Sequence, residues 1–133
     1  MKTIGRFVFD SSTATTLSAD QNIPLPTATT STNCISCDGT NITINRCGVY
    51  QVTANFTFVA TAAGANETQM YRNGNAVPGA HAISTAAAAD DNLPQSFSTV
   101  ITVPRNAPTA TINFKATNAT TLTVANVIVT KVS

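Results

Sequence analysis

Hydrophobic and polar residues alternate along much of this chain. In the stretch GVYQVTANFTF, residues 48–58, every even position from Tyr50 to Phe58 is apolar, and the odd positions are polar apart from Val49. Residues 109–115 repeat the pattern. Successive side chains of a β-strand point to opposite faces. Both segments therefore predict strands with one face in a core and the other toward water.

Alternation and turn signals together predict nine strands and no helix. Turn sequences such as Asp38-Gly39 and Asn73-Gly74 recur at short intervals, and no segment keeps the apolar spacing of a helix through three turns. The predicted strands span residues 4–9, 30–37, 41–47, 48–60, 67–72, 75–84, 95–103, 109–115 and 121–132. This number of short strands predicts an all-β fold, an antiparallel β-sandwich of the jelly-roll type. An immunoglobulin-like sandwich and a small barrel are the alternatives, and the lack of Trp weighs against the former.

The last predicted strand is apolar on both faces. One face carries Leu122, Val124 and Ile128, and the other carries Ala125, Val127 and Val129. A strand that is apolar on both faces is normally covered on both. The core of a sandwich covers one face, and we expect a neighbouring subunit to cover the other, because isolated domains seldom expose a large apolar patch. The expected subunit contacts are Tyr50, Val124, Val127, Ile128 and Val129.

Composition narrows the range of partners. Charged residues make up 10% of the chain and the net charge is +1, whereas about a quarter of a typical globular chain is charged. The seven Lys and Arg residues are dispersed, so we expect neither nucleic acid nor a membrane as a partner. The length predicts one domain, residues 1–133. Within it, residues 1–30 form an N-terminal strand and loop that could attach the protein to something else.

The cysteines Cys34, Cys37 and Cys47 admit three interpretations. With His81 they would make a four-ligand zinc set, but residues three apart in an extended strand point to opposite faces. A disulfide between Cys47 and one of the other two would suit an oxidising environment. We favour the third interpretation, in which all three are small apolar packing residues.

Other candidate chemistry is sparse. His81, Ser84 and Asp90 lie close in sequence, but a hydrolase triad is defined by geometry, and no nucleophile-elbow motif occurs. Asp90 and Asp91 could contribute carboxylates to a calcium ion, yet they are too few to complete its shell. We therefore expect no enzyme activity and no catalytic, cofactor-binding or metal site.

Two runs resemble a known family. The run DGTNITINRCGVYQVTANFTF, residues 38–58, resembles the central hairpin of tumour necrosis factor and complement-type jelly rolls, in which a long alternating strand follows a Gly-x-Tyr. The run MYRNGNAVPGA, residues 70–80, resembles the bacterial and phage branch, which includes the C-terminal domains of collagen-like spore-surface proteins. With the Ala-rich residues after His81, the chain looks most like phage head-fibre or capsid-decoration proteins. The resemblance covers residues 38–132.

The resemblance implies a function as well as a fold. It implies a homotrimer whose inner sheet, including the first and last strands, makes the subunit contacts. It also implies a structural protein of a phage virion, with capsid or other virion proteins as partners and with contact to a host-surface glycan or protein left open. We expect a virion location after synthesis in the host cytoplasm, because the N-terminus lacks a signal peptide pattern. The alternative is a receptor- or glycan-binding module of a bacterial cell or spore surface.

Overall fold

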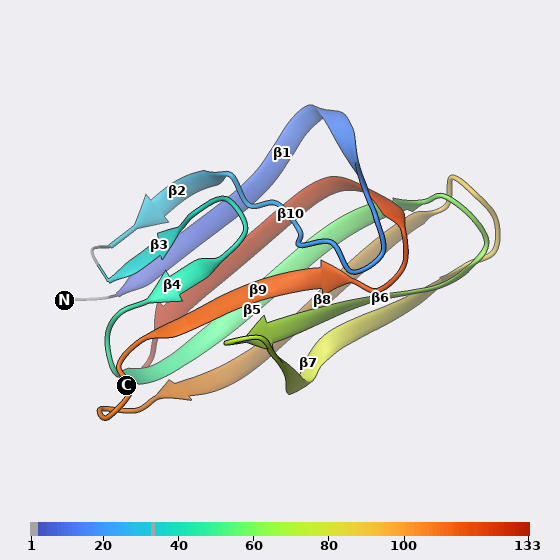
Figure 1. Ribbon diagram of the computed structural model, residues 1–133. Helices are drawn as coiled ribbons and strands as arrows, with labels where there is room; N and C mark the ends of the chain where they lie inside the picture. The colour runs from blue at the N-terminus through green and yellow to red at the C-terminus, as the bar shows by residue number, and fades with distance from the viewer. Residues whose placement is uncertain (1–2, 33) are drawn as a thin grey trace.

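Two five-stranded antiparallel sheets face each other in the computed structural model, which describes residues 3–32 and 34–133 (Figure 1). Sheet A has the strand order β2-β1-β10-β5-β8, and sheet B has the order β3-β4-β9-β6-β7. The strands are β1 Ile4–Leu17, β2 Thr27–Ser31, β3 Ile35–Cys37, β4 Ile42–Ile44, β5 Gly48–Ala60, β6 Gly64–Arg72, β7 Asn75–Ala86, β8 Asn92–Val103, β9 Ala110–Ala116 and β10 Thr120–Lys131. The predicted all-β jelly-roll sandwich is confirmed.

Most predicted strands are present, and two differ in instructive ways. The predicted strand over residues 30–37 is divided, because the chain crosses from sheet A (β2) to sheet B (β3) between them. The first strand is longer than predicted and pairs with both β2 and β10. Residues 4–31 thus contribute two strands to sheet A. Met1, Lys2 and Asn33, which belong to the predicted attachment segment and the divided strand, lie outside the described residues.

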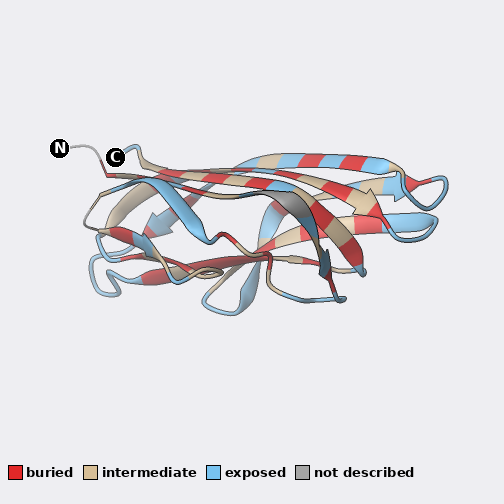
Figure 2. Cartoon of the chain, turned by 90° about the horizontal axis from the view of Figure 1, so that it is seen from above, coloured by how far each residue is buried: buried red, intermediate tan, exposed pale blue. Residues whose placement is uncertain are grey.

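The core lies between the sheets, where the apolar faces of the alternating strands meet. Figure 2 shows buried and exposed positions alternating along the long strands. Four aromatic rings pack in the centre, with ring centroids 5.5 to 6.3 Å apart; they belong to Phe56, Phe58, Phe97 and Phe114. Burying one such side chain stabilises a fold by about 1.5–3 kcal/mol. The alternation in β5 and β9 therefore predicts the core residues of these strands correctly.

Strand β10 departs from the predicted faces at one point. Its register against β5 shifts between Leu122 and Val124, as expected at a β-bulge. The extra residue of a bulge reverses the face toward which the following side chains point. Leu122 consequently points inward together with Ala125, Val127 and Val129, all of them fully buried. Val124 remains outside at 42% exposure, and Ile128 is partly exposed on the same outer side.

A buried polar link joins the two sheets. The Thr68 hydroxyl on β6 donates to Oε1 of Gln95 on β8 at 2.5 Å, and Nε2 of Gln95 donates to the backbone carbonyl of Asn66 at 3.0 Å. Thr68 and Gln95 are both buried. Hydrogen bonds made in a low-dielectric interior are costly to break, because the partners cannot turn to water. This link therefore ties the edge strand of sheet A to sheet B.

The two ends of the sandwich are distinct. Thr3, the first described residue, and the C-terminus lie at one end of the sandwich (Figure 1), which we call the base. The turn after β4 and the turn after β8 also reach the base, since Gly48 pairs with Val103 there. The opposite end, which we call the apex, carries the connections after β5, β7 and β9. These two ends differ in charge, as described below.

Candidate interaction surfaces

The outer face of sheet A is formed by long strands, β1, β10, β5 and β8. We define it by twelve side chains that the strand register places in three rows across β1, β10, β5 and β8. The rows are Arg6, Ile128, Thr53, Ser98; then Val8, Asn126, Asn55, Ser96; then Asp10, Val124, Thr57, Pro94. All twelve are exposed or partly exposed. The face is therefore available for contact in the single chain.

This face is nearly free of charge. Its only ionisable side chains are Arg6 and Asp10, both on β1, and the rows across β10, β5 and β8 contain none. Arg6 Nε donates to Oδ1 of Asn126 at 2.8 Å, which holds the guanidinium against the sheet. The outer side of sheet B differs, since Lys115 Nζ lies 5.1 Å from the centre of the Tyr71 ring. Low charge on an exposed face is typical of surfaces that a partner covers.

The predicted subunit-contact residues divide between two environments. Val124 and Ile128 lie on the outer face of sheet A. Tyr50, Val127 and Val129 are fully buried in the core of the same chain. The structure thus leaves Val124 and Ile128 able to touch a second subunit directly, while the other three support that face from behind.

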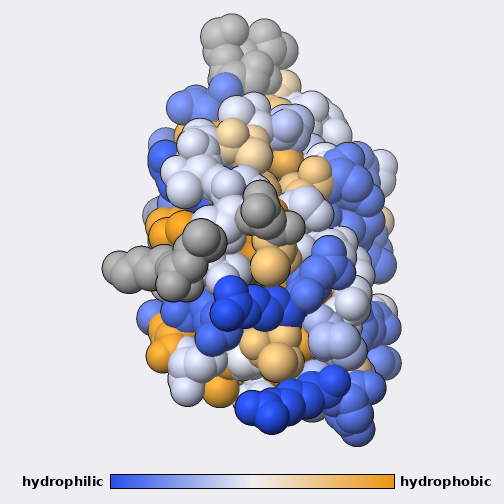
Figure 3. Space-filling view, turned by 90° about the vertical axis from the view of Figure 1, so that its left-hand side faces the viewer, coloured by the Kyte–Doolittle hydropathy of each residue, from blue (hydrophilic) through white to orange (hydrophobic). Residues whose placement is uncertain are grey.

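A groove at the base was not anticipated from the sequence. Its volume is about 430 Å³, and the end of β8, the start of β5 and the end of β10 form its walls. Arg46, Arg105 and Lys131 line it, and no Asp or Glu side chain does. These cations are far apart in the sequence, so only the meeting of strand ends brings them together. Figure 3 views the molecule from this end, where strongly hydrophilic side chains lie beside apolar ones.

Two contacts position the groove cations. The Tyr50 hydroxyl, buried in the core, donates to the backbone carbonyl of Arg46 at 2.7 Å and so holds that loop. Burial raises the pKa of the Tyr50 hydroxyl, so it remains a donor at neutral pH. Gly48 has a positive φ of 149°, and a Cβ there would lie 2.6 Å from Cε of Lys131. The glycine therefore lets the Lys131 side chain lie close over the backbone.

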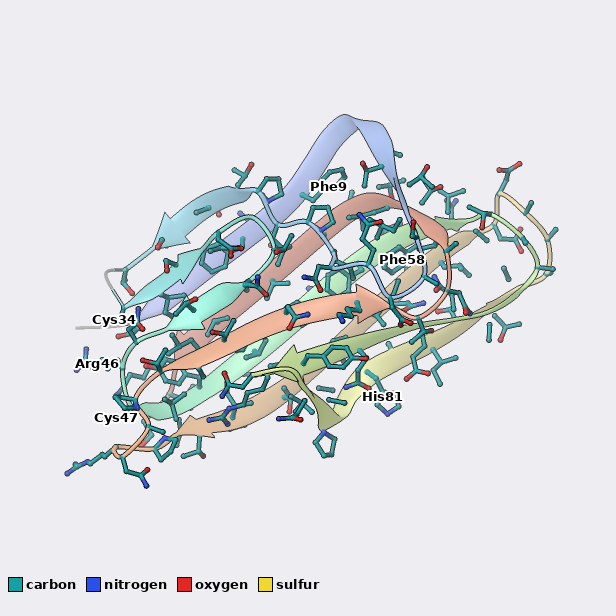
Figure 4. The ribbon with its side chains drawn as sticks, in the orientation of Figure 1. Phe9, Cys34, Arg46, Cys47, Phe58 and His81 are labelled. Atoms are coloured by element: carbon teal, nitrogen blue, oxygen red, sulfur yellow. The ribbon has the colours of Figure 1, made fainter. Side chains whose placement is uncertain are left out.

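The cysteines are free thiols in two separate places. Cys34 and Cys47 lie near Arg46 at the base (Figure 4) and close enough to Tyr50 to influence its pKa. Cys37 lies on β3, where its Sγ is 3.5 Å from the backbone carbonyl of Leu25 and burial raises the pKa of the thiol. In the described part of the chain, no three His, Cys, Asp or Glu side chains gather as a metal site would require.

The remaining sequence candidates do not form one site. His81 lies on β7, away from Cys34 and Cys47 (Figure 4), and its Nδ1 is 3.6 Å from Oε1 of Glu67. The Ser84 hydroxyl donates to the carbonyl of Pro94 at 3.4 Å.

The acidic pair belongs to a turn at the apex. The Asp91 carboxylate accepts the backbone N–H groups of Ala87 and Ala88 at 2.9 and 3.2 Å. Asp90 has a left-handed backbone with φ of 70°, a conformation that Asp adopts more readily than most residues. The described contacts of Asp91 are therefore those of a side chain that stabilises its own loop.

A small cavity of about 210 Å³ opens at the apex. Alanine, glycine and threonine dominate its walls, and Asn66 and Asn118 also line it. The carboxamide of Asn66 is buried, and neither its oxygen nor its nitrogen has a hydrogen-bond partner. An unpaired buried amide of this kind is uncommon and invites a functional explanation.

Comparison with known proteins shows a shared fold. No family model and no curated protein matches the chain. The structure of Eiger TNF from S. frugiperda superimposes with a TM-score of 0.79 at 9% identity, over 99% of this chain and 93% of that one. Murine APRIL at pH 5.0 gives 0.73 at 10% identity, over 99% and 100% of the two chains. The chain is therefore a jelly roll of the tumour necrosis factor type.

A protein described as a vertex protein shares this fold as well. PRD1 vertex protein P5 superimposes with a TM-score of 0.59 at 12% identity, over 98% of this chain and 97% of that one. The described part of the chain forms no helix that could span a lipid bilayer. At these identities the comparisons establish the architecture alone, and the function has to be argued from the surfaces.

Proposed function

We propose that this chain is a structural protein of a phage virion that assembles as a homotrimer through the outer face of sheet A. The observation that carries the proposal is the near-absence of charge on that face, where Val124 and Ile128 stand among Ser, Thr and Asn side chains. The number of copies, three, is what the family resemblance implies. The likeness to PRD1 vertex protein P5 supports a place on the virion, as a capsid-decoration or head-fibre protein.

Burial of this face between copies would explain the low charge of the whole chain. A subunit interface tolerates Ser, Thr and Asn if they find partners, but an unpaired carboxylate there costs several kcal/mol. The one carboxylate of this face, Asp10, lies on β1, and the rows across β10, β5 and β8 contain none. Polar side chains of β10 and β5 on this face already have hydrogen-bond partners. Asn126 accepts a hydrogen bond from Arg6, and Thr53 shares one with Ser98. The trimer would thus present its loops outward and keep its neutral sheets together.

The test is a pair of carboxylate substitutions on the outer face of sheet A. We expect native mass spectrometry to find three copies for the wild type, and single copies for Val124→Asp/Ile128→Asp with an unchanged β-sheet circular dichroism spectrum. Val127→Asp, the substitution that the sequence suggests, would not serve, because Val127 is fully buried in the chain's own core and its replacement would unfold the chain.

The matched control is Ile83→Asp. Ile83 is 59% exposed, comparable to Val124 at 42%, but it lies on β7 of sheet B. We expect this variant to remain trimeric. A wild type that stays a single copy at high concentration, or an Ile83→Asp variant that dissociates as fully as the double variant, would contradict the proposal.

A receptor- or glycan-binding module is the second candidate function, and the apex cavity favours it. Among the residues that the structure describes, no Asp, Glu, Lys, Arg or His side chain lines the cavity, and the exposed polar side chains of Thr61 and Asn118 in its wall could hydrogen-bond to a sugar. A glycan array probed with the purified protein tests this candidate. Specific binding that Asn118→Ala abolishes would support it, and an array without signal would contradict it.

A further inference from the structure

We infer that the base groove binds an acidic peptide segment of a partner protein. The groove is the 430 Å³ hollow lined by Arg46, Arg105 and Lys131. The binding itself follows from the charges and shape of the groove. The further statement that the segment belongs to another virion protein, so that the base is the attachment end, rests on the proposed function.

The groove cations have no acidic side chain beside them. No Asp or Glu side chain lines the groove, and among residues 3–32 and 34–133 the contact between an acidic side chain and a basic one is that of Glu67 with His81 on sheet B. Arg46 makes one long hydrogen bond, from Nη1 to the hydroxyl of Thr3 at 3.5 Å. Like charges gathered in a concave site repel one another and raise the local potential. An anionic ligand would relieve that repulsion.

The acidic residues gather at the other end of the molecule. Asp20, Glu67, Asp90 and Asp91 make four of the six acids, and their backbones bond to Ala116, Thr117 and Ala60, where strands end at the apex. The sandwich therefore has a positive base and a negative apex. Such an arrangement steers an acidic partner toward the base and orients the protein on it.

The groove is organised before any ligand arrives. Tyr50 holds the carbonyl of Arg46, and Gly48 allows Lys131 to lie along the backbone. Arg105 follows Pro104 at the turn after β8, where proline restricts the backbone. Ordering flexible groups on binding reduces affinity, so a site whose backbone is already fixed loses less affinity when a ligand binds. Two guanidinium groups can each grip a carboxylate with two parallel hydrogen bonds.

The surroundings favour a peptide over a nucleic acid or a small anion. Val49, Val103 and Pro104 form apolar walls between the cations, which suits a segment that mixes acidic and apolar residues. Nucleic acid requires a continuous basic stripe, but Arg6 and Lys115 are engaged on other faces. Small-anion sites usually offer free backbone N–H groups, and the Val49 N–H already bonds to the carbonyl of Ser133.

The experiment is calorimetric titration of the full chain with a capped hexaglutamate peptide and with its hexaglutamine counterpart. We compare Arg46→Gln/Arg105→Gln with the matched control Arg72→Gln/Lys115→Gln, which removes the same two charges elsewhere. We expect the groove variant to bind hexaglutamate about tenfold more weakly, which equals about 1.4 kcal/mol, because it removes two of the three groove cations. The control should change by less than about twofold, and hexaglutamine should not bind.

Three results would overturn the inference: absence of hexaglutamate binding, equal losses in both double variants, or tighter binding of inorganic phosphate than of the peptide. Native mass spectrometry on the same samples separates this inference from the proposed function. Peptide binding by a chain that is not trimeric would support the groove as a peptide-binding site and contradict the proposed assembly. A trimer that does not bind the peptide would support the proposed assembly and contradict peptide binding by the groove.

Discussion

At the scale of single residues, polar side chains stabilise the turns that connect the strands. Asp38 is the clearest case, since its Oδ1 accepts the backbone N–H groups of Thr40 at 3.0 Å and Asn41 at 2.8 Å. These two bonds hold the pKa of the carboxyl below its usual value of 3.8. The β3–β4 turn therefore depends on an ionised aspartate.

The stability that Asp38 contributes should depend on pH. Because the pKa is lower in the folded chain, the contribution is fully present above the unfolded pKa, near 4, and is lost as the pH falls through the folded value. We expect wild type to be more stable than Asp38→Ala at pH 6, and the difference to shrink toward zero below pH 4. Urea unfolding from pH 6 to pH 2.5 measures it, and a difference that is constant over this range would contradict the prediction.

At the scale of strands, the buried link between β6 and β8 stands out. Thr68 and Gln95 are buried polar residues in a largely apolar core, and through them an edge strand of sheet A is bonded to sheet B. Strand faces are usually read from apolar residues alone. Here the inward face of β8 includes Gln95, a polar residue that alternation places on the same face as Phe97, Ile101 and Val103.

Removal of this link should destabilise the sandwich. Gln95→Ala leaves the Thr68 hydroxyl and the Asn66 carbonyl buried without partners, and we expect the free energy of unfolding to fall by about 2 kcal/mol. Gln51→Ala is the control, since Gln51 is an exposed glutamine on the neighbouring strand β5, and its loss should cost less than about 0.5 kcal/mol. Chemical denaturation of both variants measures the difference, and equal effects would show that the link is unimportant.

At the scale of the whole molecule, the outer face of sheet A and the base groove are separate surfaces with different chemistry. One is a neutral sheet that includes Val124 and Ile128, and the other is a cationic hollow at the strand ends. A trimer closed by the first would carry three copies of the second at one end. Assembly and attachment would then be independent functions of the same fold.

Assembly of this kind makes stability depend on concentration. If only folded chains associate, mass action raises the apparent melting temperature as the protein concentration rises. We expect this rise for wild type and for Ile83→Asp, and a concentration-independent midpoint for Val124→Asp/Ile128→Asp. Thermal scans over a hundredfold range of protein concentration measure it, and a wild-type midpoint that does not move would argue against the trimer.

The sequence by itself determined the class of fold and the faces of the regular strands. In β5 and β9, strict alternation over many residues leaves one face apolar, and a sheet has only one way to bury it. The bounds of β5, Gly48–Ala60, agree with the prediction for this reason. Local patterns of this kind are sufficient because they need no knowledge of the neighbouring strand.

Only the tertiary structure decided the rest. The bulge that turns Leu122 inward depends on the register between β10 and β5, which no single segment encodes. The groove cations Arg46, Arg105 and Lys131 come together because antiparallel strands return to the same end of the sandwich. The physical reason is common to both: pairing between distant segments sets which side chains meet, and alternation along one segment sets only which way they point.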